Sequence, residues 1–73
     1  MILHTKFRVS EVSRSIDGQG KTIHETVSLM PVRSDENKAW SLNMPVALIN
    51  MRITNPEAFG TLVQGSEVVV DFI

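Results

Sequence analysis

The sequence "NPEAFG" at positions 55–60 predicts a single helical turn between two stretches that have the pattern of β-strands. Asn55 suits the N-cap, because its side chain can accept a hydrogen bond from a backbone N–H of the first turn. Pro56 suits the first helical position, where no N–H is needed, and Gly60 can end the turn in a left-handed conformation. We therefore expect one short helical turn directly before the last strand.

The rest of the chain is dominated by the alternation of apolar and polar side chains that is typical of half-buried strands. This alternation predicts five strands, at 3–16, 22–33, 39–43, 47–54 and 68–73. A shift of the apolar positions after Val9 predicts a β-bulge near Ser10 and Glu11. The sequence "DGQG" at 17–20 predicts the hairpin turn between the first two strands, and "SDENK" at 34–38 predicts a solvated loop.

This element order predicts one all-β domain that covers residues 1–73. Four strands, one helical turn and a terminal strand are the order of a five-stranded SH3-like small barrel. An OB-like barrel is the alternative, but its helix normally precedes the fourth strand. We therefore expect the SH3-like arrangement.

Composition narrows the classes of function. Seven Lys or Arg against eight Asp or Glu give a net charge of −1, so no basic excess favours nucleic acid. Cysteine is absent, which excludes disulfides and cysteine-based zinc sites. No apolar run approaches the roughly 20 residues of a membrane helix. These features favour a cytoplasmic protein without a membrane partner.

The sequence offers no motif for catalysis. Its two histidines, His4 and His24, lie in different predicted strands, and no further ligand is placed to complete a metal site. No serine lies in a G-x-S-x-G motif, and "DGQG" lacks the lysine of a phosphate-binding loop. We therefore predict a noncatalytic protein with no metal and no cofactor.

Two sets of residues are candidates for binding. The first is Glu36, Asn37, Lys38 and Trp40, in and after the predicted loop. Trp40 has two interpretations, as a core residue in the third strand or as a platform for a ligand. The second set is Met44, Pro45 and Val46, an apolar turn tip that either a second protomer or the chain's own barrel would cover. This second set predicts a homo-oligomer, most simply a dimer.

A basic stripe offers an alternative function. Lys6, Arg8 and Arg14 share the outer face of the first predicted strand, and Arg52 lies on the fourth. Together with Trp40, these charges would suit single-stranded nucleic acid, by phosphate contact and base stacking. The nearly neutral total charge makes this the less favoured partner.

Four pieces of the sequence carry a resemblance that covers nearly the whole chain. They are "ETVSLMPV" at 25–32, "ENKAW" at 36–40, "ITNPEAFG" at 53–60 and "VVVDF" at 68–72. With these pieces the chain resembles a family of very short proteins of tailed bacteriophages and prophages, of unassigned function. It departs from the family at Met44–Ala47, where a polar turn is expected, and at Val68 and Val69, where an aromatic residue is expected. The resemblance implies a phage origin and the cytoplasm of a bacterial host.

These observations lead to one functional hypothesis. We expect a noncatalytic phage accessory protein that acts by binding a host protein, as inhibitors of host defence do, or by holding a small nucleotide between subunits. A single-stranded nucleic-acid-binding protein is the alternative.

Overall fold

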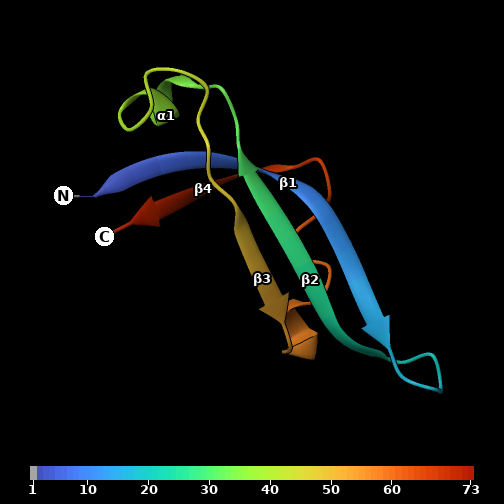
Figure 1. Cartoon of the computed structure of the whole chain (residues 1–73). Helices are drawn as coiled ribbons and strands as arrows, with labels where there is room; N and C mark the ends of the chain where they lie inside the picture. Colours follow the sequence, from blue (N-terminus) through green and yellow to red (C-terminus); the bar gives the residue numbers. More distant parts are fainter. Residues whose placement is uncertain (1) are drawn as a thin grey trace.

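Four antiparallel strands form one sheet in the computed structural model, which describes residues 2–73 (Figure 1). The strands are β1 (Leu3–Ile16), β2 (Thr22–Pro31), β3 (Ile49–Ile53) and β4 (Glu67–Phe72). A one-turn helix, α1 (Asp35–Lys38), follows β2, and a 3₁₀ turn, η1 (Pro56–Ala58), precedes β4. The strand order across the sheet is β3-β2-β1-β4, so β3 and β4 are its two edges. The prediction of a mostly β fold with a helical turn before the last strand is confirmed.

The predicted third strand at 39–43 is wrong. The Asn37 carbonyl accepts the backbone N–H groups of Trp40 at 3.2 Å and Ser41 at 3.0 Å, which holds this stretch in a turn after α1. The predicted loop at 34–38 contains α1 itself. Without that strand, the part of the chain that the structure describes shows no pairing between β3 and β4. The sheet is therefore open in one chain and does not form the predicted five-stranded barrel.

The long first strand, β1, pairs with two neighbouring strands. Its first half pairs with β4, from Leu3 opposite Phe72 to Arg8 opposite Glu67, and its second half pairs with β2. The register with β2 shifts between Val9 and Glu11, which confirms the predicted bulge. Because one extra residue reverses the faces, the bulge returns the next apolar residue of β1 to the apolar face of the sheet.

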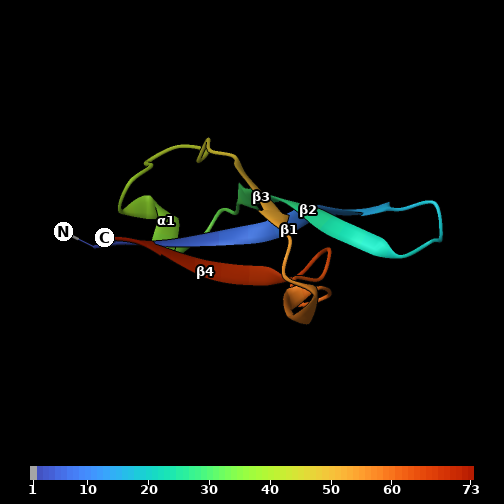
Figure 2. The ribbon, with the colours of Figure 1, turned by 90° about the horizontal axis from the view of Figure 1, so that it is seen from below.

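The core lies on one face of this sheet. Four side chains from the two central strands are almost fully buried there: Phe7, Val9, Val27 and Leu29. Leu62, in the segment after η1, is among the residues that pack against them. Figure 2 shows segments 39–48 and 54–66 on opposite sides of the sheet. The alternation at 47–54 predicts that Met51 is buried, which is wrong, since 43% of it is exposed on the edge strand β3.

The turn before β4 forms as the sequence predicts. The side chain of Asn55 accepts the backbone N–H of Glu57 at 3.1 Å, and Pro56 occupies the first helical position. Gly60 follows with a φ of +81°, which an L-residue rarely adopts. This left-handed turn points the Gly60 N–H at β2, where it becomes part of a buried site described below.

The molecule is long and thin. Its extents are 48 × 22 × 15 Å and its radius of gyration is 14.3 Å, against about 11 Å for a typical domain of this length. The hairpin between β1 and β2 projects from one end, and Ile16 and Ile23 are exposed on it (Figure 1). No helix within residues 2–73 is long and apolar enough to cross a membrane.

Candidate binding surfaces

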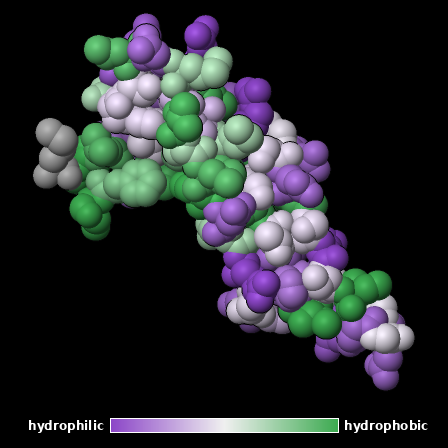
Figure 3. Space-filling model, viewed as in Figure 1, coloured by the Kyte–Doolittle hydropathy of each residue, from purple (hydrophilic) through white to green (hydrophobic). Residues whose placement is uncertain are grey.

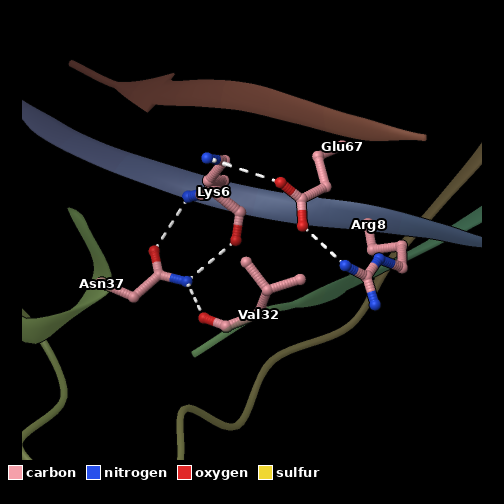
Figure 4. A network of polar contacts seen from close by, with 5 residues as sticks. All are labelled: Lys6, Arg8, Val32, Asn37 and Glu67. Carbon is pink, nitrogen blue, oxygen red and sulfur yellow. Dashed lines mark hydrogen bonds and ion pairs between the residues drawn. The ribbon is translucent and has the colours of Figure 1, made fainter. Parts of the chain in front are cut away.

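Helix α1 places Asn37 against the backbone of β1, beyond the end of the ladder with β2. The Asn37 side-chain oxygen accepts the Lys6 backbone N–H at 2.8 Å and the Trp40 indole N–H at 3.1 Å. Its amide group donates to the carbonyls of Lys6 at 2.8 Å and Val32 at 2.6 Å (Figure 4). The buried amide thus uses both donors and accepts two hydrogen bonds. Asn37, which the sequence analysis assigned to a binding set, is thus buried, and its side chain joins α1 to the sheet.

The other residues of this predicted set divide between two environments. Trp40 is half-buried beside Asn37, but it lies in the turn after α1 and outside the core cluster. Glu36 and Lys38 are exposed, and Lys38 Nζ lies 3.1 Å from the Asp35 carboxylate. Only the exposed pair is therefore free to meet a partner.

An open hollow of about 470 Å³ lies between α1 and the segment that follows it. It is lined by Arg33, Ser34, Asp35, Lys38, Leu42, Asn43, Met44 and Pro45. A second hollow of about 330 Å³ continues past Met44 and Pro45 to Val46 and Met30. The structure therefore brings Lys38, from the first predicted set, to the same surface as the predicted oligomer contact.

The segment between α1 and β3 exposes apolar side chains at every second position. We call the four residues Leu42, Met44, Val46 and Leu48 the apolar arch. All are exposed, Leu42 to 93% and Val46 to 86%. Figure 3 shows apolar residues gathered over the upper half of the molecule, where this segment lies, whereas the lower half is mainly hydrophilic apart from apolar residues near its end. A patch of this kind is typical of a surface that another molecule covers.

The basic stripe predicted on β1 is held in ion pairs. Arg8 Nη2 lies 2.6 Å and Lys6 Nζ 3.4 Å from the Glu67 carboxylate, and hydrogen bonds from these two groups, Arg8 first, lower the pKa of Glu67. Arg14 pairs with Glu25 at 2.7 Å. Since carboxylates partner each of these three cations, the stripe offers little free positive charge to phosphates.

The histidines and carboxylates do not gather into a metal site. His4 Nδ1 lies 2.8 Å from the Asp71 carboxylate, across the β1–β4 pair. His24 pairs with Ser15 in the hairpin instead. Among residues 2–73, no group of three or more His, Cys, Asp or Glu side chains is placed to hold a metal ion.

Glu25 is a buried site that the sequence analysis missed. Its carboxylate accepts the Gly60 backbone N–H at 3.1 Å and the Arg14 Nε–H at 2.7 Å, and the residue has no exposed surface. The Gly60 hydrogen bond is the main cause that lowers the pKa of Glu25 below its ordinary value, and Arg14 adds to it. Glu25 therefore anchors the segment after η1 to the sheet. One signal was available, because position 25 has the parity of the buried Val27 and Leu29.

We predict that acid weakens the fold partly through Glu25. Its folded-state pKa lies below the ordinary 4.5, so its contribution to stability is complete above that pH and is lost as the pH falls through the lowered pKa. Thermal midpoints measured from pH 7 to pH 3 should fall below about pH 4.5. Glu25→Gln should lower the midpoint at pH 7 and fall less on acidification. A Glu25→Gln variant with the wild-type pH profile would contradict this role, and Glu57→Gln, at an exposed position, is the matched control.

Comparison with protein-family models, with curated proteins and with solved structures found no match for this chain. The resemblance to short phage proteins therefore stays a prediction.

Proposed function

We propose that this chain is a noncatalytic phage accessory protein that self-associates and binds a protein of the bacterial host, in the host cytoplasm. One observation carries the proposal: the accessible surface area of a single chain is larger than that of a typical folded monomer of the same mass. Its accessible surface is 5375 Å², whereas a folded monomer of 8.1 kDa is expected to have about 4,500 Å². The excess of about 900 Å² is close to the roughly 800 Å² that each partner buries in a standard interface.

The lack of a second layer of secondary structure over the sheet, within residues 2–73, also supports self-association. Stable domains usually pack two layers of secondary structure around their core, but here one sheet is covered on its apolar face by little more than loops. Thirteen large apolar side chains are exposed among the described residues. In this proposal, a sheet edge that stays open in one chain is closed by a contact between chains, which takes the place of the barrel predicted within one chain.

The apolar arch and the hollow beside it form the surface that we assign to the host protein. The arch supplies apolar area, and the charged residues Arg33, Asp35 and Lys38 line the hollow beside it. An apolar centre with a polar rim is the usual anatomy of a protein interface. The hollow is open, so a side chain of the partner could enter it without a change in the fold.

A small nucleotide held between subunits is the second candidate, for one reason. The lining of the hollow includes the cations Arg33 and Lys38 and the apolar residues Leu42, Met44 and Pro45. Cations suit phosphate groups and an apolar wall suits a base. Because the hollow is open in one chain, a second subunit would have to cover the ligand.

Affinity capture with matched variants tests the proposal. The tagged wild-type chain is expected to recover one host protein from bacterial lysate, and Val46→Asp combined with Leu42→Asp should reduce this recovery at least about tenfold. Ile16→Asp, which places a charge on the distant hairpin, should leave recovery unchanged. Mass spectrometry of small molecules in the same eluate tests the nucleotide candidate. Failure to recover a protein or a nucleotide, or equal recovery by all three chains, would contradict the proposed function.

A further inference from the structure

We infer that the self-association of the proposed function is made by β4, which pairs antiparallel with β4 of a second copy about a two-fold axis at Val70. Such pairing would join two four-stranded sheets into one continuous sheet. The inference rests on the proposed function and adds the surface, the strand direction and the register of the contact.

The free edge of β4 lacks the features that usually prevent pairing with another strand. Proteins protect an edge with lysine, proline, a bulge or a very short strand. The sequence of β4, "EVVVDF", contains no lysine, arginine or proline, and its register with β1 runs without a shift over six residue pairs. The opposite edge, β3, is one residue shorter and carries the cationic Arg52. Of the two edges, β4 is therefore the one open to a further strand.

The charges of β4 are turned away from its free edge. Glu67 is held by Lys6 and Arg8, and Asp71 is held by His4, and all three partners belong to β1 on the inner side. Between the two carboxylates, Val69 is 63% exposed. The Glu67 ion pairs and the His4–Asp71 hydrogen bond thus hold both carboxylates against β1, and the exposed Val69 lies between them.

The backbone of β4 is placed to accept a partner strand. Val9 donates its N–H to the Ser66 carbonyl at 2.9 Å. The hydrogen-bonded pairs of this ladder therefore join odd residues of β1 to even residues of β4. Hydrogen-bonded residues alternate along an antiparallel ladder. Val68, Val70 and Phe72 therefore direct their backbone groups toward β1. The backbone groups of Glu67, Val69 and Asp71 consequently point outward at the free edge.

Strand overlap and charge together select the register of the pair. An axis at Val68 or Phe72 would pair at most three residues of the six-residue strand β4 with their copies. An axis at Val69 would place Glu67 opposite Asp71 of the partner subunit, and an axis at Asp71 would place two Asp71 side chains together. Like charges directly opposite one another destabilise a sheet. An axis at Val70 avoids both, and it places Phe72 opposite Val68 of the partner subunit and Val70 opposite its own copy. These residues lie on the same face as Phe7, so the core would extend across the axis.

Single-cysteine crosslinking tests this register, since the chain has no cysteine of its own. Val70→Cys would face its own copy across a non-hydrogen-bonded pair, where the Cα atoms lie about 4.5 Å apart, within reach of a disulfide. The matched control Val68→Cys would lie about 14 Å from its copy, which is too far. We expect mild oxidation to convert at least tenfold more of Val70→Cys than of Val68→Cys to covalent dimer. Equal crosslinking, or faster crosslinking of Val68→Cys, would overturn the register.

A proline variant tests the edge without a crosslink. Val69→Pro removes an N–H that points outward and is unused within one chain, so the fold, checked by circular dichroism, should survive. The dimer dissociation constant should rise about 100-fold, since two hydrogen bonds are lost symmetrically and each ring obstructs the approach. Val69→Thr keeps the N–H and should dimerise as the wild type does. A folded Val69→Pro dimer of unchanged affinity would overturn the β4 contact alone, whereas a monomeric wild-type chain would overturn the proposed function itself.

Discussion

Asn37→Asp is expected to lower the free energy of unfolding at pH 7 by about 3 kcal/mol or more, although it changes one amide to a carboxylate of the same shape. The amide donates to the carbonyls of Lys6 and Val32, and an ionised carboxylate has no hydrogen to offer them. Two buried carbonyls would then face a buried negative charge, which is strongly unfavourable. Denaturant unfolding of the variant and of the wild type measures the difference.

Two controls separate this effect from a general effect of charge. Asn43→Asp makes the same chemical change at an exposed position of the following segment, and it should shift stability by no more than about 0.5 kcal/mol. Lowering the pH should partly restore Asn37→Asp, because a protonated carboxyl regains one donor. Equal stability of the two variants at pH 7 would contradict the role of Asn37 as the link between α1 and β1.

Phe7→Ala is expected to cost about 3–5 kcal/mol, the range for removal of a buried aromatic side chain. Phe7 is the largest of the fully buried core residues, and a domain of this size has a net stability of only about 3–5 kcal/mol. The variant should therefore be largely unfolded by circular dichroism. Trp40→Ala should cost less, since Trp40 is half-buried and outside the core cluster.

The order of these two losses is informative. The sequence favoured Trp40 as a core residue, whereas the structure assigns the centre of the core to Phe7 and its neighbours. If Trp40→Ala unfolds the chain and Phe7→Ala leaves it folded, the assignment is reversed. Leu42→Ala serves as the surface control, because a side chain that is 93% exposed has little packing to lose.

Local features of the fold were predictable because each depends on a few adjacent residues. The cap at Asn55, the left-handed Gly60 and the bulge after Val9 follow from side-chain chemistry and from a change in the apolar alternation. The third strand at 39–43 failed because alternation does not require pairing in a sheet: the Asn37 carbonyl holds Trp40 and Ser41 in a turn, and the segment that follows lies outside the sheet. The structure uses alternation in this way in the apolar arch, where every second side chain is exposed.

The candidate site was predicted only in part, because two of its residues act through distant partners. Asn37 and Lys6 are 31 positions apart, and no local pattern indicates that a loop asparagine will pair with a strand backbone. Glu25 and Gly60 are 35 positions apart and meet only after the sheet and the turn have formed. By contrast, the sequence indicated an apolar turn tip at Met44–Val46, and Met44 and Val46 are exposed in the structure.

The excess accessible surface of one chain implies that the protein self-associates, and sedimentation equilibrium of the wild-type protein measures this directly. Across a dilution series at micromolar concentration, we expect a mass that rises with concentration toward twice the chain mass of 8.1 kDa. A mass fixed at 8.1 kDa throughout the series would show that the chain is a monomer and would contradict self-association.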